Sequence, residues 1–192
     1  MITALILAAG QSKRMGQPKM LLPWGETTVL EKVIATFRVA EIDEILVVTG
    51  GAREQIEVLV KDSARTVFNP EYANGEMLSS VQAGLAGLEP GTESVLIGLG
   101  DQPQARESIV RLVLDEYHAS KASIVVPSFQ MQRGHPWLVA RDHWSEILEM
   151  HSPASLRDFL NSHTDEIHYV EVYNDSILQD LDTPEDYLKF RP

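Results

Sequence analysis

The segment TALILAAGQSKRMGQPK, residues 3–19, joins an apolar run to a loop that contains two glycines and three cationic side chains. Residues 3–7 are apolar or β-branched at every position, which predicts a strand covered on both faces. Glycines let the backbone approach a ligand closely, and exposed N–H groups beside Lys13, Arg14 and Lys19 suit a polyphosphate. The segment therefore predicts a buried strand that leads into a phosphate-binding loop.

The spacing of this loop excludes the two most common phosphate-binding motifs. A dinucleotide fingerprint requires GxGxxG, and a P-loop requires GxxxxGK[ST]. Gly16 follows Gly10 by six positions and precedes Gln17, so neither pattern fits. On spacing alone, a flexible surface turn with solvated charges remains an alternative to a ligand-binding loop.

Short apolar runs alternate with helical patterns through the first two-thirds of the chain. Further strands are predicted at residues 44–49, 65–68, 94–99 and 122–126. Between them, apolar side chains recur at helical spacing and predict buried helix faces. These faces are Val29, Val33 and Phe37; Met77, Val81, Leu85 and Leu88; and Ile109, Leu112, Val113 and Tyr117. The alternation predicts an α/β fold, a three-layer α/β/α sandwich with a mainly parallel, Rossmann-like sheet.

The last third of the chain has a less regular pattern. The predicted elements are a helix with Ser152 and Pro153 as N-cap and first turn that runs through Leu160, strands at residues 168–172 and 176–178, and a short helix opened by Thr183 and Pro184. No repeat, low-complexity tract or linker interrupts the sequence. Residues 1–192 are therefore predicted to form one domain.

Composition excludes several classes of function. The net charge of −12 argues against a general nucleic-acid binder. No apolar run approaches the roughly 20 residues that cross a bilayer, and the apolar start lacks the basic region of a signal peptide. The absence of cysteine excludes disulfides and thiolate metal sites and fits the cytoplasm. We therefore expect a cytoplasmic protein that binds neither nucleic acid nor membranes.

An aspartate follows the predicted strand at residues 94–99. Ligands of open parallel sheets bind beyond the carboxyl ends of the strands, and Asp101 stands there within GLGDQP, residues 98–103. A carboxylate in that place could hold a magnesium ion. It could equally cap the helix that is expected from Gln104, so the residue alone leaves both interpretations open.

A second acidic cluster, QDLDTPEDY, occupies residues 179–187. Thr183 as N-cap, Pro184 at the first helical position and the acids after them are typical of a helix start. This explanation leaves Asp180 and Asp182 without a structural role.

The string LAAGQSKRMGQPK, residues 7–19, resembles the opening signature of a nucleotidyltransferase family. That family includes molybdenum-cofactor cytidylyltransferases and guanylyltransferases and many sugar-nucleotide pyrophosphorylases. The resemblance implies the GT-A-like fold of nucleotide-diphospho-sugar transferases and a loop that wraps a nucleoside triphosphate. The substrate-binding residues that it implies are Leu7, Ala8, Ala9, Gly10, Ser12, Lys13, Arg14 and Lys19. Arg14 and Lys19 would also act in catalysis by neutralising phosphate charge.

Two acidic motifs extend this resemblance. GDQP, residues 100–103, matches the family's metal-binding aspartate motif in its cytidylyltransferase-like form. It implies that Asp101 binds Mg²⁺ and takes part in catalysis, with Gly100 beside the substrate. DLDTPEDY, residues 180–187, resembles the C-terminal motif that completes the metal site. Asp182 is the expected ligand, and Asp180 is the alternative.

A looser match follows the third predicted strand. Asn69, Gly75, Ser79 and Ser80 resemble a stretch that lies near the base and ribose in the family. Helical spacing would turn Met77 toward the core, which would leave Gly75, Ser79 and Ser80 free to contact a ligand. A polar helix face with a flexible start is the alternative explanation.

Another loose match is RGHP, residues 133–136, which contains a GHP motif of the cytidylyltransferase-like branch. The resemblance implies that His135 contacts the acceptor. A single histidine is more often structural than catalytic. No HxxxH or HExxH pattern in the sequence indicates zinc.

The implied reaction is nucleotidyl transfer. An oxyanion of the acceptor would attack the α-phosphorus of a triphosphate in line, and pyrophosphate would leave without the need for a strong general base. The LAAG, GDQP, GHP and DTPEDY strings are typical of the cytidylyltransferase-like branch. They imply CTP and molybdopterin (or its molybdenum-loaded form) as substrates, Mg²⁺ as cofactor and transient contact with a molybdoenzyme or its chaperone.

Residues 151–159, HSPASLRDF, depart from the GD-x-GAR-type stretch of many members of that branch. Because this region could shape the acceptor pocket, two alternatives stay open. One is transfer to another phosphate acceptor, such as a sugar 1-phosphate. The other is a non-catalytic accessory protein that binds a nucleotide or cofactor. Lys19, Asp101 and Asp182 together favour an enzyme, since binding alone would not need a complete metal site.

Overall fold

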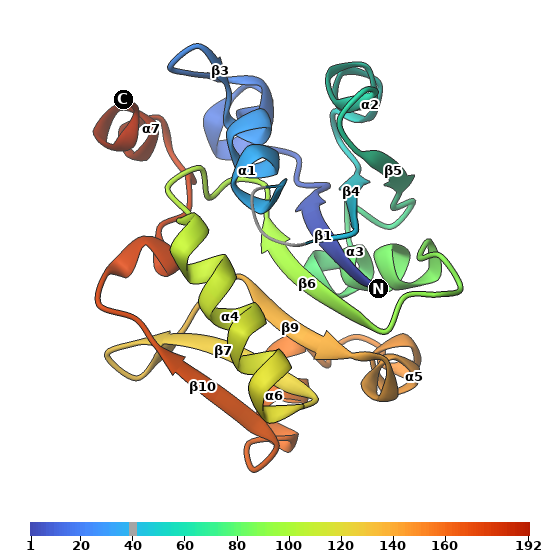
Figure 1. Ribbon diagram of the computed structural model, residues 1–192. Coiled ribbons are helices and arrows are strands. Elements are labelled where there is room, and N and C mark those ends of the chain that lie inside the picture. The colour runs from blue at the N-terminus through green and yellow to red at the C-terminus, as the bar shows by residue number, and fades with distance from the viewer. Residues whose placement is uncertain (39–41) are drawn as a thin grey trace.

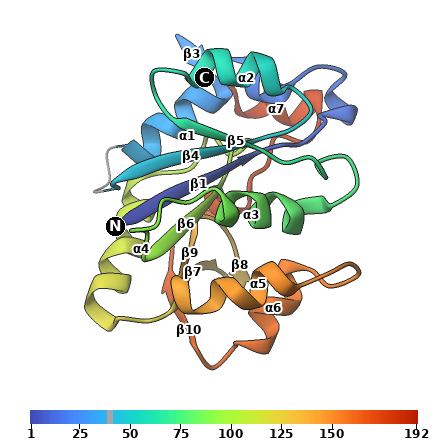
Figure 2. The ribbon, with the colours of Figure 1, turned by 90° about the vertical axis from the view of Figure 1, so that its right-hand side faces the viewer.

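The computed structural model describes residues 1–38 and 42–192, and its main feature is a mixed sheet with helices on both faces (Figures 1 and 2). The strands are β1 (Ile2–Ala8), β4 (Glu44–Thr49), β5 (Arg65–Phe68), β6 (Ser94–Leu99), β7 (Ile124–Phe129), β8 (Gln132–Arg133), β9 (Trp137–Ala140) and β10 (Ile167–Glu171). Their order is β10-β7-β9-β6-β1-β4-β5, and β8 pairs with β7. Among the described strands of this sheet, β8 and β9 run antiparallel to their neighbours: β8 pairs with β7, and β9 pairs with β6 and β7. The other pairs are parallel, so the prediction of a mainly parallel sheet is confirmed.

Alternate residues of β1 enter two separate cores, which makes the fold three-layered. Ala4 and Ile6 pack with helices of one layer, and Leu5 and Leu7 pack with helices of the other. The first layer contains α1 (Val29–Arg38), α2 (Arg53–Val60) and α4 (Glu107–Ser120). The second contains α3 (Glu76–Ala86), α5 (Trp144–Glu149) and α6 (Leu156–Ser162) (Figure 2). The predicted α/β/α sandwich is confirmed.

The reversed direction of β9 matters for the site. Its first residue, Trp137, pairs with Ile97 near the carboxyl end of β6. The segment that leads into β9 therefore lies at the same edge as the loops that follow β1 and β6. Residues from the two halves of the chain are thereby brought to one edge of the sheet.

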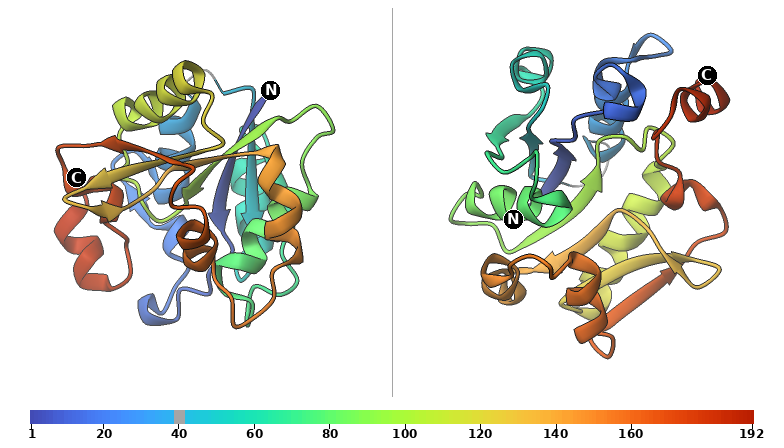
Figure 3. Two further views of the ribbon diagram at one scale, coloured as in Figure 1. Left: turned by 90° about the horizontal axis from the view of Figure 1, so that it is seen from below. Right: turned by 180° about the vertical axis from the view of Figure 1, so that it is seen from behind.

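The C-terminal helix α7 (Pro184–Phe190) packs against the small hairpin of β2 (Pro23–Trp24) and β3 (Thr27–Thr28) (Figure 3). The hydroxyl of Tyr187 donates a hydrogen bond of 2.6 Å to the carbonyl of Pro23, and its ring lies 6.4 Å from that of Trp24. Leu181, just before α7, is fully buried in the same cluster. These contacts anchor the end of the chain beside the loop that follows β1.

Two predictions for the last third are wrong. The helix expected from Ser152 begins at Leu156, because Ser155 and Asp158 form a reciprocal capping box that Ser152 cannot form. The strand expected at residues 176–178 is a 3-10 helix, η4 (Asp175–Leu178), in which the side chain of Asn174 accepts from the N–H of Ser176 at 3.2 Å. The helix opened by Thr183 and Pro184 is confirmed, with Thr183 as its N-cap.

Two expected core residues face outward instead. Met77 is 39% exposed and Leu112 is 44% exposed, so both predicted placements are wrong. The buried stripe of α3 is Leu78, Val81 and Leu85, and that of α4 contains Ile109, Val110, Val113 and Leu114. No helix in the described ranges has the length and apolar character needed to span a membrane.

Candidate active site

The loops after β1 and β6 lie side by side because the two strands pair in parallel, with Leu7 opposite Leu99. The N–H of Gly100 donates to the carbonyl of Leu7 at 3.0 Å and continues this pairing past the strand end. Asp101 follows directly. The aspartate is therefore placed beside the start of the cationic loop by the register of the sheet.

Four predicted residues meet at this edge. The Lys19 ammonium forms an ion pair with the Oδ2 of Asp101 and lies 3.3 Å from the Oδ1 of Asp182. The guanidinium of Arg14 lies 2.9 Å from the Oδ2 of Asp182. Lys19 and Asp101 are largely shielded, with 12% and 16% of their side chains exposed. Residues from the two ends of the chain thus form a partly buried charge cluster.

The charges in this cluster control one another. Burial lowers the pKa of Lys19, but the carboxylates of Asp101 and Asp182 outweigh that effect and raise the pKa above 10.5. Burial and the charge of Asp101 raise the pKa of Asp180, whereas a hydrogen bond of 2.8 Å from the side chain of Gln102 opposes that rise. Lys19 is therefore a fixed positive charge between Asp101 and Asp182.

The conformation of the cationic loop supports Lys19. Ser12 and Gly16 both have positive φ, 51° and 68°, and enclose the short 3-10 helix η1 (Lys13–Met15). The hydroxyl of Ser12 accepts a hydrogen bond of 3.1 Å from the N–H of Lys19. Lys13 is exposed and has no ion pair among the described residues. Ser12 thus fixes the far end of the loop, and Lys13 is free to meet an anion.

The first part of the loop offers its backbone rather than its side chains. Leu7, Ala8 and Ala9 are buried, so their side chains are directed away from solvent. Ala8 packs in one core, and Leu7 and Ala9 pack in the other. Gly10 is exposed, and a methyl group added there would find no protein atom within 4 Å. The space over Gly10 is therefore open for a ligand to approach the chain.

The position of Asp182 is held from both sides. The N–H of Leu181 donates to the carbonyl of Asp101 at 3.1 Å, which ties the C-terminal segment to the loop after β6. On the other side, Thr183 and Asp186 form the capping box of α7. Asp182 lies between these two anchors, so its carboxylate has a defined place opposite Asp101.

The donor set suits a hard divalent cation. Asp101 and Asp182 both direct a carboxylate oxygen at the Lys19 ammonium, which shows that a single cation can contact both groups. Mg²⁺ prefers oxygen ligands and keeps several of its waters. The two carboxylates therefore fit such an ion, with substrate phosphates or water as the remaining ligands.

The segment after β5 forms a hydrogen-bonded cluster of its own. The side-chain amide of Asn69 donates to the hydroxyls of Ser79 at 2.9 Å and Ser80 at 3.1 Å. The N–H of Ser79 donates to the carbonyl of Gly75, and an added Cβ at Gly75 would lie 2.3 Å from the Oγ of Ser79. Asn69 and Ser80 are buried. The expectation that Ser80 is free to contact a ligand is therefore wrong, whereas Ser79 and Gly75 are partly accessible.

A cavity of about 1300 Å³ lies at the same edge, beyond β7, β8, β9 and β10. Its walls include Met77 from the start of α3, His135 before β9, and Tyr169 on β10. Residues 155–157, from the divergent stretch, also line it. The cavity is large enough for a drug-sized or larger ligand.

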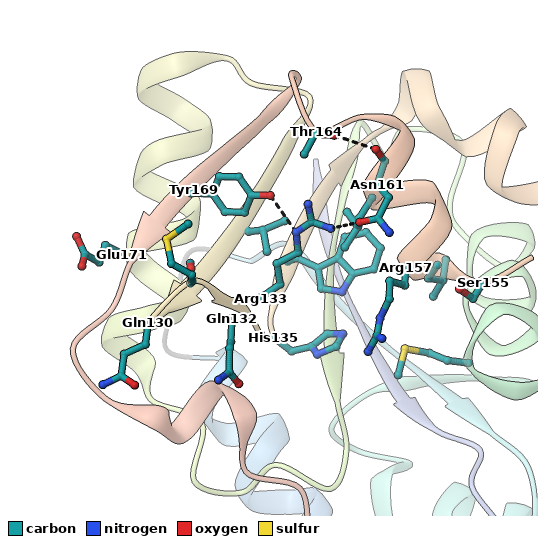
Figure 4. Close-up of a pocket in the computed structure, with 18 residues that line it drawn as sticks. Gln130, Gln132, Arg133, His135, Ser155, Arg157, Asn161, Thr164, Tyr169 and Glu171 are labelled. Carbon is teal, nitrogen blue, oxygen red and sulfur yellow. Dashed lines mark hydrogen bonds between the residues drawn. The ribbon is translucent and has the colours of Figure 1, made fainter.

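Two arginines enter this cavity (Figure 4). Arg133 is held by Asn161, whose Oδ1 accepts at 2.8 Å, and by the hydroxyl of Tyr169 at 2.9 Å. Arg157 forms no hydrogen bond or ion pair with another described residue, although it lies near the charge of Asp158. The cavity therefore holds a positioned guanidinium and a second one that is available to an anion.

His135 contributes an unsatisfied polar atom to the cavity. Burial lowers the pKa of His135 to about 4, so the ring is neutral near pH 7. Its Nε2 is buried and has no hydrogen-bond partner among the described residues. Gln104, in the loop after β6, likewise has both side-chain amide atoms buried without a partner there. Such groups indicate places where a bound molecule can satisfy them.

One carbonyl group connects the cavity with the charge cluster. The carbonyl of Ile177 accepts from the N–H of His135 at 3.2 Å and from the side-chain amide of Gln102 at 3.3 Å. A Cβ at Gly134 would lie 2.5 Å from the same oxygen, so only glycine allows this close approach. Gln102, next to Asp101, and His135 are thereby held by the same carbonyl group.

Sequence patterns found the charge cluster but missed much of the cavity. Met77 was expected in the core, and Arg133 was quoted in RGHP without a role. Arg157, Asn161 and Tyr169 belong to no motif, although Arg157 lies in the stretch that departs from the family pattern. That departure was one signal of the cavity in the sequence. The glycine of GHP was a second, indirect one, since Gly134 lies against η4.

Comparison with known proteins gives concordant results. Residues 4–167 match the family described as the MobA-like NTP transferase domain. The chain is 32% identical over 190 residues to a molybdenum cofactor cytidylyltransferase of Escherichia coli (strain K12), covering 97% of this chain and 94% of that protein. It is 28% identical over 192 residues to nicotine blue oxidoreductase of Paenarthrobacter nicotinovorans, covering 96% and 93%.

Solved structures show the same similarity over the whole fold. Rv0371c from Mycobacterium tuberculosis H37Rv has a TM-score of 0.85 at 28% identity, covering 98% of this chain and 96% of that one. A structure of Rv0371c in complex with manganese has a TM-score of 0.82 at 27% identity, covering 99% and 97%.

Proposed function

The chain belongs to the MobA-like NTP transferase family and is a nucleotidyltransferase, and we propose that it transfers CMP from CTP to molybdopterin or its molybdenum-loaded form. One observation carries the proposal. A cationic loop and two converging carboxylates lie at the same sheet edge as a large cavity with a free guanidinium. A triphosphate and a bulky anionic acceptor can thus be held side by side.

The triphosphate would lie over the loop after β1. The open space above Gly10 admits a phosphate to the backbone, and Arg14 and Lys19 would neutralise its charge. For this, both cations would exchange their contacts with Asp182 for contacts with phosphate. Mg²⁺ held by Asp101 and Asp182 would supply positive charge at the reacting phosphates. The manganese complex of Rv0371c supports the choice of a divalent cation.

The acceptor would occupy the cavity. An oxygen of its phosphate would form the new bond to the α-phosphorus of the triphosphate, and the bond from that phosphorus to the bridging oxygen of pyrophosphate would break. A phosphate nucleophile is ionised near pH 7, so no residue has to remove a proton. Arg157 would orient the acceptor by charge, and His135 would contact it as a neutral ring.

The choice of substrates rests on similarity to particular relatives. The LAAG and GDQP strings and 32% identity to the Escherichia coli molybdenum cofactor cytidylyltransferase support CTP and molybdopterin. The divergent residues 155–157 line the cavity, which keeps another phosphate acceptor, such as a sugar 1-phosphate, as the second candidate. Because the loop and the cavity share one sheet, we also propose that residues 1–192 act as one domain.

Release of pyrophosphate tests the proposal. The protein is incubated with Mg²⁺ and each of the four ribonucleoside triphosphates, with and without molybdopterin or a panel of sugar 1-phosphates. We expect release only with CTP and molybdopterin. Release that depends on a sugar phosphate would change the proposed acceptor to that sugar phosphate. Release with another triphosphate would change the proposed nucleotide. Nucleotide binding without release for any acceptor would support the accessory-protein alternative and overturn the enzyme.

A further inference from the structure

A second group of metal-ligating side chains lies at the opposite edge of the sheet. His143 ends the 3-10 helix η3 (Arg141–His143) after β9, His163 follows α6, and Glu166 precedes β10. One ligand atom from each of the three lies within 4.8 Å of the other two. The three side chains therefore come from three separate segments of the chain.

The two histidines are held in place by packing. The ring of His143, 9% exposed, meets the edge of Phe159 at 5.7 Å and the ring of His163 at 4.7 Å. The Nε2 of His143 lies 2.9 Å from the hydroxyl of Ser123. Phe159 also contacts the ring of His163 at 4.7 Å. Packing thus fixes the orientations of the two imidazoles.

Carboxylates surround the second histidine. The Nδ1 of His163 lies 2.8 Å from Glu166, and its Nε2 lies 2.8 Å from Glu146. The other oxygen of Glu166 lies 3.6 Å from the Nε2 of His143. A metal-bound histidine commonly gives its second ring N–H to a carboxylate, which orients the ring and strengthens the ligand. Glu146 is in the right place for that contact.

From this geometry we propose that His143, His163 and Glu166 form a binding site for a Zn²⁺-type transition-metal ion, with Glu146 orienting His163. Two imidazole nitrogens and one carboxylate oxygen are a typical zinc ligand set, and a water completes a tetrahedron. Zinc lies about 2.1 Å from such ligands, so the ligand atoms of a tetrahedral site are roughly 3.4 Å apart. The distances from the carboxylate of Glu166 lie on either side of that spacing, 2.8 Å to the Nδ1 of His163 and 3.6 Å to the Nε2 of His143. Glu166 is half exposed, so its carboxylate can rotate to adjust both distances.

The site is chemically distinct from the carboxylate pair at the nucleotide edge. Mg²⁺ favours oxygen ligands, whereas imidazole nitrogen favours zinc and its neighbours in the transition series. The chain would therefore bind the two kinds of ion separately. α6 begins at the cavity with Leu156 and Arg157 and ends at this cluster. An ion here would connect the C-terminal end of α6 to the segments beside β9 and β10.

Zinc titration of the full chain tests this inference. The protein is stripped with a chelator, saturated with Mg²⁺ to fill the carboxylate pair, and titrated with Zn²⁺ in competition with a chromophoric chelator. We expect one zinc ion per chain and a rise in the midpoint of thermal unfolding. His163→Ala should weaken zinc binding by at least about tenfold. Even the loss of a residue that only orients a metal ligand weakens metal affinity by about tenfold or more. Glu166→Gln should act in the same direction with less risk to folding.

His168→Ala is the matched control. His168 also lies on β10, pairs with a glutamate (Glu116, 2.9 Å) and is outside the cluster. Its removal should leave zinc affinity unchanged. Zinc binding that survives both His163→Ala and Glu166→Gln would overturn the site, as would a chain that binds no zinc. Binding that survives these variants but is lost in Asp101→Asn would place the ion at the nucleotide edge instead.

Discussion

The ammonium group of Lys19 forms an ion pair with the carboxylate of Asp101, 82 positions further along the chain, at the carboxyl edge of the sheet. The same ammonium lies 3.3 Å from Asp182, so one lysine neutralises both candidate metal ligands. This side chain occupies the place that we assign to a divalent cation. Lysine and metal ion therefore compete for the same carboxylates, and the proposed role of Lys19 requires its release toward phosphate.

Removal of the Lys19 charge should separate metal binding from catalysis. In Lys19→Met, Mn²⁺ no longer competes with an ammonium group, so its affinity without nucleotide should rise by about tenfold, equivalent to about 1.4 kcal/mol. Turnover should fall by about 100-fold or more because the triphosphate loses a cation. Electron paramagnetic resonance of free Mn²⁺ measures the first effect and pyrophosphate release the second. Lys13→Met, an exposed lysine of the same loop, should leave Mn²⁺ affinity unchanged.

Asp101→Asn should abolish pyrophosphate release while the fold is retained. The substitution keeps the size of the side chain but removes the charge proposed to hold the metal. Circular dichroism should show the wild-type helix content. Asp115→Asn, on the exposed side of α4, is the matched control and should have normal activity. Near-normal turnover in Asp101→Asn would remove this residue from the metal site.

The meeting of Lys19 with Asp101 was predictable from the sequence for a topological reason. Asp101 follows β6 as the cationic loop follows β1, and neighbouring parallel strands end at the same edge. Asp182 has no strand to place it, and the prediction for it depended on resemblance alone. In the structure, the burial of Leu181 and the packing of Tyr187 on Pro23 supply the missing constraint.

Other features have no local signature in the sequence. The cavity depends on the reversed direction of β9, which an apolar run of four residues does not encode. The pairing of His143 with His163 joins positions 20 apart on different elements, so no zinc spacing is visible. Met77 fits a helical stripe on spacing, but the buried stripe of α3 is shifted by one residue toward Leu78. In each case tertiary packing decided between patterns that local periodicity leaves equivalent.

Gly10→Ala should impair nucleotide binding without affecting stability. The added methyl group meets no protein atom within 4 Å, so the thermal unfolding midpoint should stay within about 1 °C of wild type. The same methyl group would occupy the space through which a phosphate approaches the backbone, and KM for the triphosphate should rise by about tenfold or more. Gly91→Ala, which is equally unhindered but lies far along the chain, should change neither quantity. An unchanged KM in Gly10→Ala would place the triphosphate elsewhere.

Arg157→Ala should weaken binding of the acceptor and leave binding of the nucleotide unchanged. A charge-assisted hydrogen bond of about 1.5–3 kcal/mol is lost, so KM for the acceptor should rise by roughly 10- to 100-fold while KM for the triphosphate stays constant. Steady-state kinetics with each substrate varied in turn separates the two. Arg111→Ala, on α4 in the opposite helical layer, should affect neither KM. Equal effects on both substrates would argue that Arg157 supports the fold rather than the acceptor.

His135 should make the stability of the protein depend on pH. Burial lowers its pKa from 6.5 to about 4, so the unfolded chain binds the proton more tightly than the folded one between those values. The stability that comes from the neutral ring is therefore complete above pH 6.5 and is lost as the pH falls from 6.5 toward 4. Between pH 7 and pH 5 the loss should be at most about 2 kcal/mol.

His135→Gln removes this titration and leaves every other histidine in place. Urea unfolding of both proteins at pH 7 and at pH 5 measures the difference, and the loss of unfolding free energy on acidification should be smaller in the variant than in the wild type. Because the folded ring stays neutral down to about pH 4, the proposed contact of His135 with the acceptor should not titrate between pH 5 and pH 8. The same pH dependence of unfolding in both proteins would mean that the ring is hydrated in the folded state, and its unpaired Nε2 would then be no sign of a missing ligand.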